Sequence, residues 1–299
     1  MIRVVAALLI SVLAQSSPLP GTPFQPWREG YRTINAVEFS PDGQSMFIAL
    51  ETARVAKIEG REPAASAPEI ALYESRREGD GWSRPRLLPF AGAYKDYEAS
   101  LSPDGRWMVF NSWRPAPDGR TSQKNNLWLA RRTATGWAEP VYLSAINRHE
   151  SEESYAAIAP DGVMLFLGEG ATDAFGVDYN LYQTRITGDA ASPPSPFPPA
   201  STAAGEGDPW FARDGSYVIF TRWDRAKSWE TDAELFITFK SGDRWTTPIA
   251  LSELNDPTGP DYAVSIAGSP ERIYWKRRGG TFSTEWSPIL KAVQARARD

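Results

Sequence analysis

The motif Leu101-Ser102-Pro103-Asp104-Gly105, followed by a short run that ends at Phe110, decides the fold because the chain repeats it. The copies recur every 53 to 62 residues, at Phe39–Phe47, Leu101–Phe110, Ile158–Phe166, Phe211–Phe220 and, in degenerate form, Ile266–Trp275. Proline at the second turn position, aspartate after it and glycine at the left-handed position predict a β-hairpin. The flanking runs are rich in β-branched and aromatic residues, which is typical of strands.

Two further elements follow each hairpin. Runs such as Asn126–Leu129 and Glu234–Ile237 predict a third strand. A Trp-x-x-Pro motif then opens a fourth strand, at Trp82–Pro85, Trp137–Pro140 and Trp245–Pro248, and a proline-rich run replaces it in the third unit. Such a four-stranded antiparallel sheet can bury both faces only by stacking against its neighbours. The sequence therefore predicts an all-β fold, a β-propeller.

The repeat length sets the number of blades and domains. Units of about 55 residues fill residues 35–299, so we expect five blades, with six as the alternative. The fifth unit has no clear fourth strand, because it ends in an Ala/Arg-rich run. The stretch Pro18–Thr33 is too short for a unit but can supply that missing outer strand. Residues 15–299 are then a single propeller domain.

Residues 1–14 have the pattern of a cleaved export signal. Arg3 precedes an apolar run from Val4 to Leu13, and small residues precede a cleavage site before Gln15. The run is about half as long as a membrane-spanning helix requires, and an uncleaved anchor is the alternative. No later segment is apolar enough to span a membrane. We therefore expect a monomeric periplasmic or secreted protein.

The residue counts exclude several chemistries. Without cysteine there is no disulfide, thiolate nucleophile or Cys-ligated metal, and a single histidine excludes a multi-His metal centre. A net charge of −5 argues against a nucleic-acid partner. No Gly-x-Ser-x-Gly nucleophile elbow is present. We expect no cofactor, because a Ca²⁺ ion in the channel would need six to eight converging oxygens that residue spacing does not show.

The repeat resembles a known family. Ser-Pro-Asp-Gly hairpins, Asn-Leu-Trp strands and Gly-Trp-x-x-Pro elements are similar to the TolB-type β-propeller repeat of exported bacterial proteins. The similarity is closest over Asn126–Gly162 and covers nearly all of residues 15–299. The resemblance implies a propeller and a role in the cell envelope. It does not imply which site is used, because function depends on residues placed on the fold.

Acidic residues recur at one position of the repeat. They stand nine positions before the hairpin glycine, or before its equivalent Pro270, at Asp96, Glu153, Glu206 and Asp261. Two more acids follow two positions later, with tyrosines among them: Glu98, Asp208, Tyr97, Tyr155 and Tyr262. Because the innermost strand begins here, we expect an acidic ring at one mouth of the channel, able to bind a cation or basic groups of a partner. Alternatively, each carboxylate caps backbone N–H groups or pairs with an arginine of the next blade.

The ends of the predicted second strands combine arginine with tryptophan. The residues are Trp113, Arg114, Arg222, Trp223 and Arg277. Exposed Trp and Arg side chains are common anchors for a sugar ring, an anionic group or a protein loop. The alternative is that the tryptophans pack between blades while the arginines form solvated ion pairs.

Two functional hypotheses follow from these patterns. The favoured one is a non-enzymatic binding or scaffold propeller of the cell envelope, which recognises a protein, peptide or glycan at one face. The alternative is a glycosidase-like hydrolase or lyase at the channel mouth that uses paired carboxylates, for example Glu153 and Glu206.

Overall fold

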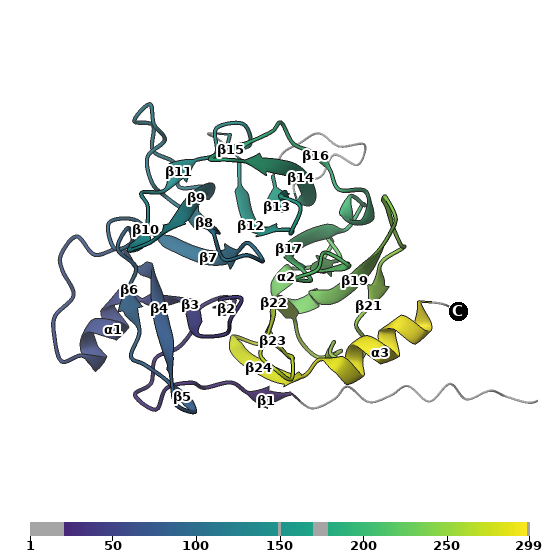
Figure 1. The fold of residues 1–299 in the computed structure, drawn as a ribbon, viewed down its shortest axis with the longest axis horizontal. Coiled ribbons are helices and arrows are strands. Elements are labelled where there is room, and N and C mark those ends of the chain that lie inside the picture. Colours follow the sequence, from purple (N-terminus) through teal and green to yellow (C-terminus); the bar gives the residue numbers. More distant parts are fainter. Residues whose placement is uncertain (1–20, 149–150, 170–178, 298–299) are drawn as a thin grey trace, which may run out of the picture.

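The repeat units form five antiparallel sheets that stand side by side around a central axis (Figure 1). The structure is a computed structural model that describes residues 21–148, 151–169 and 179–297. It is a five-bladed β-propeller, which confirms the predicted fold and blade number. The predicted export signal, residues 1–14, lies outside the described residues.

The strands follow the same order in each blade, from the axis outward. The first blade contains β2 (Glu38–Phe39), β3 (Ser45–Glu51), β4 (Ile70–Glu78), β5 (Gly81–Trp82) and β6 (Arg86–Leu87). The second contains β7 (Asp96–Leu101), β8 (Trp107–Ser112), β9 (Asn126–Thr133), β10 (Gly136–Trp137) and β11 (Val141–Tyr142). The third contains β12 (Glu153–Ile158), β13 (Val163–Gly168), β14 (Asn180–Thr187), β15 (Ala190–Ala191) and β16 (Ser195–Pro196). The fourth contains β17 (Gly205–Phe211), β18 (Tyr217–Trp223), β19 (Glu234–Ser241), β20 (Arg244–Trp245) and β21 (Ile249–Ala250).

The fifth blade joins the two ends of the described chain. Its strands are β22 (Asp261–Ala267), β23 (Arg272–Arg277) and β24 (Gly280–Glu285), and the N-terminal β1 (Thr22–Pro23) pairs with β24 as the outer strand. This confirms that the stretch before the first unit closes the ring. The Ala/Arg-rich run after β24 is a helix, α3 (Ser287–Arg296), which buries Ile289 and Val293 against the fourth and fifth blades.

The repeated motif forms the expected turn. In the second blade the Gly105 N–H donates to the Ser102 carbonyl at 2.7 Å, and Asp104 accepts bonds from the Ser102 hydroxyl and the Arg106 N–H. Gly105 has φ of 69°, a left-handed conformation that favours glycine. The backbone geometry of the hairpin therefore explains why this turn motif recurs along the chain.

Hydrophobic clusters fill the spaces between neighbouring blades. The repeated phenylalanines at the centre of the second strands are at most 2% exposed: Phe47, Phe110, Phe166 and Phe220. Phe47 of the first blade meets Trp137 of the second edge-on, with ring centroids 6.0 Å apart. Periodic aromatic residues therefore belong to the core, as expected from their recurrence in every unit.

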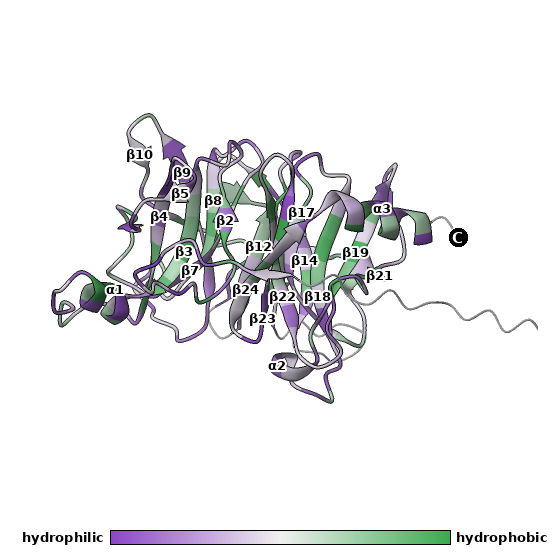
Figure 2. Cartoon of the chain, turned by 90° about the horizontal axis from the view of Figure 1, so that it is seen from below, coloured by the Kyte–Doolittle hydropathy of each residue, from purple (hydrophilic) through white to green (hydrophobic). Residues whose placement is uncertain are grey.

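Loops at one end of the blades carry two short helices. α1 (Thr52–Ile58) follows β3, and α2 (Trp229–Asp232) follows β18, so both lie between the second and third strands of a blade. A 3₁₀ helix, Pro198–Ala200, precedes the fourth blade. α2 projects from the stack of blades (Figure 2) and places Trp229 at the end of the channel. Among the described residues, no helix has the length and apolar character needed to cross a membrane.

Candidate functional site

In four blades the innermost strand contains a β-bulge, and the bulge turns one side chain of that strand toward the channel. In four blades the same repeat position has a positive φ of 47° to 52°, at Glu98, Tyr155, Asp208 and Ala263. The strand register shifts there, for example between Tyr97 and Ser100. A positive φ is unusual for residues other than glycine, and bulges commonly redirect side chains near functional sites. The bulges therefore mark the ring of residues that faces the axis.

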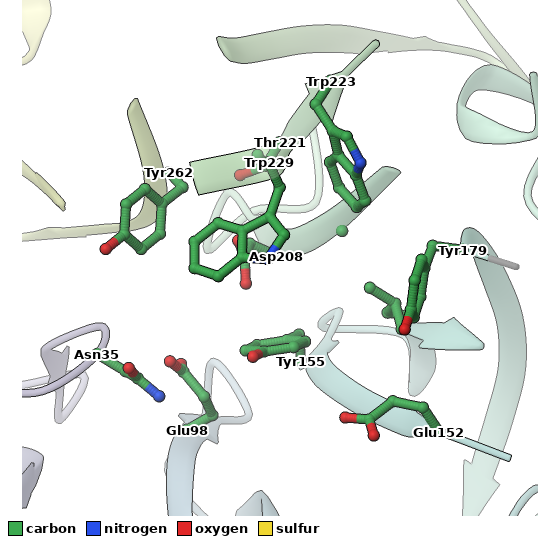
Figure 3. A pocket seen from close by; sticks show the side chains of 12 residues that line it. Asn35, Glu98, Glu152, Tyr155, Tyr179, Asp208, Thr221, Trp223, Trp229 and Tyr262 are labelled. Carbon is green, nitrogen blue, oxygen red and sulfur yellow. The ribbon is translucent and has the colours of Figure 1, made fainter. Parts of the chain in front are cut away.

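A cavity of about 250 Å³ lies above this ring, at the end of the channel from which α2 projects. All five blades contribute to its wall (Figure 3). The lining residues are Asn35, Glu98, Glu152, Tyr155, Leu167, Tyr179, Gly207, Asp208, Thr221, Trp223, Trp229 and Tyr262. Of the residues predicted from the sequence, five meet in this cavity: Glu98, Tyr155, Asp208, Trp223 and Tyr262.

Glu98 and Asp208 project into the cavity from opposite sides, with the Tyr155 ring between them (Figure 3). The surrounding protein raises the pKa of both carboxyls, mainly by removing solvent, and the charge of Asp208 raises that of Glu98 further. The Ala36 N–H, which donates to Glu98 Oε1 at 3.4 Å, partly opposes this rise in pKa. The two carboxyls therefore resist holding two negative charges at once.

The Thr221 hydroxyl lies beside Asp208. It lowers the pKa of Asp208 by favouring the charged carboxylate, yet among the described residues it makes no hydrogen bond of ordinary geometry. A buried hydroxyl without a partner costs free energy, so this group is available to a ligand or a water molecule.

Aromatic side chains form the walls around the carboxylates. Trp229 of α2 is 44% exposed and meets Tyr262 of the fifth blade edge-on, with ring centroids 5.4 Å apart. Trp223 lies against Gly205, where a Cβ would come within 2.1 Å of the indole. Glycine is therefore required at this close approach. The resulting cavity has apolar sides and a carboxylate floor.

A polar network supports the cavity on the side of the second and third blades. The Asn125 side chain accepts hydrogen bonds from Tyr97 Oη at 2.7 Å and Trp113 Nε1 at 2.9 Å, and its amide nitrogen donates to Glu152. Tyr97 is buried. The structure thus places Tyr97 and Trp113 behind the cavity wall, where they orient Asn125 and Glu152.

Four acids predicted for the channel mouth lie inside the blades instead. The fully buried carboxylates pair with arginines: Asp96 with Arg114 at 2.8 Å, Glu153 with Arg148 at 3.2 Å, Glu206 with Arg222 at 3.1 Å, and Asp261 with Arg277 at 2.7 Å. Their expected placement in an acidic ring is wrong. The structural alternative holds in part: Glu153, Glu206 and Asp261 also accept backbone N–H groups, but none of the four arginines comes from the following blade.

The arginines predicted as loop-face anchors are the partners of these acids. Arg114 is 8% exposed and reaches both oxygens of Asp96, at 2.8 and 3.0 Å. Arg222 and Arg277 each donate through Nε to one oxygen of their partner, Glu206 at 3.1 Å and Asp261 at 2.7 Å. The guanidinium groups therefore compensate buried charge, in ion pairs that are more buried than the solvated pairs of the alternative.

The bulge explains why the sequence misplaced these acids. Side chains two positions apart on a regular strand share one face, so Asp96 and Glu98 were expected together. The extra residue of the bulge breaks this alternation, so Asp96 turns toward β8 while Glu98 faces the axis. Tyr155 occupies the same repeat position as Glu98 and Asp208, which was the available sequence signal for it.

The repeat pattern gave little or no basis for predicting the other lining residues. Trp229 comes from the loop between the second and third strands of the fourth blade, whose sequence is not repeated in the other units, and Asn35 precedes the first inner strand. Glu38 lines a deeper part of the channel, where burial raises its pKa to about 8 and Arg213 opposes the rise. Within the described ranges, no group of three or more His, Asp or Glu side chains is placed to hold a metal ion.

These features define the chain as a five-bladed propeller with an aromatic and acidic cavity at one end of its channel. No protein-family model and no curated protein sequence matches it. Solved structures similar in fold include TolB from Acinetobacter baumannii, with 12% identity, a TM-score of 0.43 and coverage of 84% of this chain and 54% of that chain. A protein of unknown function from Dyadobacter fermentans has 12% identity, a TM-score of 0.49 and coverage of 86% and 78%.

A puromycin-hydrolyzing peptidase of Mycobacterium tuberculosis is also similar, with 16% identity, a TM-score of 0.48 and coverage of 88% of this chain and 39% of that chain. The chain thus spans about half of the TolB structure and less of the peptidase. No family model supports the TolB-type repeat in sequence, and the TM-scores of these three structures all lie below 0.5.

Proposed function

We propose that the chain is an exported, non-enzymatic binding propeller of the bacterial cell envelope that holds a protein, peptide or glycan ligand at the channel mouth. The observation that supports this proposal is the aromatic cavity to which all five blades contribute. Concave sites with apolar walls and a few convergent polar groups are the usual form of ligand pockets. Export rests on residues 1–14, and N-terminal sequencing of the exported protein should begin at Gln15.

Trp229 is the side chain best placed to test the cavity, because it is exposed and lies at its rim. We expect Trp229→Ala to weaken retention of envelope ligands at least tenfold while leaving the melting temperature nearly unchanged. Loss of an aromatic anchor typically costs about 2 kcal/mol or more of binding free energy. Immobilised protein is incubated with envelope extract, and the retained peptides and glycans are identified by mass spectrometry and titrated by calorimetry.

Val141→Ala is the matched control, since Val141 is 38% exposed on the outer strand of the second blade. This variant should retain the same ligands as the wild type. Equal retention by all three proteins would show that the ligand binds elsewhere, and the proposed site would be abandoned.

A carboxylate-based hydrolase is the second candidate. The observation in its favour is that Glu98 and Asp208 face each other with unequally raised pKa values, as acid and base pairs do in hydrolases. The pair first considered, Glu153 and Glu206, is buried against arginines. Turnover of aryl glycosides by the wild type, abolished in Glu98→Gln, would favour this candidate over the binding propeller.

A further inference from the structure

We propose that the channel-mouth cavity binds an organic cation, an ammonium or guanidinium group held between the aromatic rings and the carboxylates of Asp208, Glu98 and Glu152. This inference rests on the proposed binding function and names the chemistry of its ligand. Three features carry it: the cavity's uncompensated negative charge, its unoccupied aromatic faces, and its volume.

Among the described residues, no basic side chain lies at ion-pair distance from a carboxyl group of the cavity. Three of its lining side chains are carboxylates, and none of the described lining residues is Lys, Arg or His. The paired acids inside the blades show the contrast, because Asp96 and its three counterparts each have an arginine within 3.2 Å. No ion pair of the described structure involves Glu98, Asp208 or Glu152. A cationic ligand would supply the missing charge.

The nearest lysine does not fill this role. Lys276 is 1% exposed, and its ammonium group donates to the carbonyls of Thr33 at 3.0 Å and Gly279 at 3.2 Å. Burial lowers its pKa to about 8, although the charge of Glu98 opposes that change. The other titratable groups that face the two carboxyls are acidic or phenolic: Tyr97, Tyr155 and Tyr262. The surrounding elements therefore leave the cavity negative.

The aromatic faces of the cavity are also open to a cation. Elsewhere in the molecule a basic side chain covers a half-buried ring, as Arg77 does over Trp82 at 5.2 Å and Arg132 over Trp137 at 5.0 Å. Among the described residues, no lysine or arginine lies over Trp229 or Tyr262. Aromatic faces that no Lys or Arg of the protein covers, close to carboxylates, form the arrangement that binds alkylammonium groups.

The volume sets the size of the group that enters. A cavity of about 250 Å³ is smaller than most pockets for drug-sized ligands. It suits a single cationic head group, either on a free small molecule or at the end of a basic side chain. A sugar ring would use the aromatic walls but would leave the carboxylate charge unpaired.

The test compares cations with neutral molecules of the same shape. Choline and its neutral isostere 3,3-dimethylbutan-1-ol, and agmatine and its neutral urea analogue, are titrated into the full chain by calorimetry at pH 7.5. We expect at least one cation to bind tenfold or more tightly than its isostere. Asp208→Asn should abolish this difference in affinity. Asp118→Asn is the control, because Asp118 forms an exposed ion pair with Arg120, and it should leave the difference unchanged.

A peptide arm identifies the source of the cation. A capped Gly-Arg-Gly peptide is compared with its citrulline counterpart and with agmatine, and N-acetylglucosamine is the neutral sugar. Tighter binding of the peptide assigns the site to a basic side chain of a partner, and tighter binding of agmatine assigns it to a free cation. Either result supports the inference.

Neutral molecules that bind as tightly as the cations, or a cation preference that survives Asp208→Asn, would overturn it, as would an absence of binding by every cation. If the cations fail while Trp229→Ala still loses an envelope ligand, the binding function stands and only the ligand chemistry is wrong. If Trp229→Ala loses nothing, the proposed function itself fails. The two failures are therefore distinguishable.

Discussion

Replacing Arg114 with alanine should destabilise the fold by about 3–5 kcal/mol, the usual cost of leaving a buried charge without its partner. Arg114 bonds to both oxygens of Asp96, and its guanidinium group lies 5.3 Å from the centre of the Phe110 ring. Asp96 is fully buried, and its remaining partner is the Ser112 hydroxyl at 2.6 Å. Urea unfolding at pH 7 measures the loss.

The loss should shrink as the pH falls. Burial already raises the pKa of Asp96 to about 6 against the opposing charge of Arg114, and removal of the arginine raises it further. A folded-state pKa above the unfolded value means that folding takes up a proton, so the variant gains stability as the pH decreases. Arg120→Ala, which breaks the exposed pair with Asp118, should change little. Equal losses for both variants would refute a structural role for the buried pairs.

The double variant Glu98→Gln/Asp208→Asn should be more stable than the wild type by about 1–3 kcal/mol at pH 8, after a discount for water in the cavity. Both carboxyls have folded-state pKa values above their ordinary range, because the site disfavours their charged forms. Wild-type stability is therefore full at acidic pH and declines as the pH rises above about 4–5 through the raised pKa values. The amides keep the shape of the side chains and cannot ionise.

Thermal melting from about pH 3.5 to pH 8 tests this prediction. The two proteins should melt nearly alike at about pH 3.5, where the wild-type carboxyls are largely protonated in both states, and diverge as the pH increases, while Asp118→Asn should follow the wild type throughout. A double variant that melts below the wild type at pH 8 would mean that the channel carboxylates stabilise the fold. That result would contradict the proposal that these carboxylates serve to bind a ligand.

The fold could be predicted from the sequence because its signals are local and repeated. Gly105 and its equivalents define the hairpins, and Phe110 and its equivalents define the core between blades. The pairing of β1 with the fifth blade could be predicted for a different reason. The fifth unit lacked an outer strand, and the residues before the first unit had no place in a repeat. Residue types that recur in every unit are therefore those that the turns and the packing between blades require.

The site was only partly predictable because it depends on departures from the repeat. Their position at the start of the innermost strand placed Asp96 and Glu98 together, and only the backbone shows that a bulge separates them. The arginine partners could not be distinguished from surface anchors, since Arg114 and Asp96 are brought together by strand pairing. Trp229 lies on a loop whose sequence is not repeated in the other units. The structure therefore places the four recurring acids inside the blades and leaves Glu98 and Asp208, together with Glu152 and Glu38, in the channel.

A crystal structure of the full chain with the tightest-binding cation from the titrations is the most direct test of this account. We predict density for the cation in the channel-mouth cavity, in contact with the Trp229 and Tyr262 rings and within ion-pair distance of Asp208. Density for the ligand only outside this cavity, for example in the hollow between the third and fourth blades near Lys240, would contradict it.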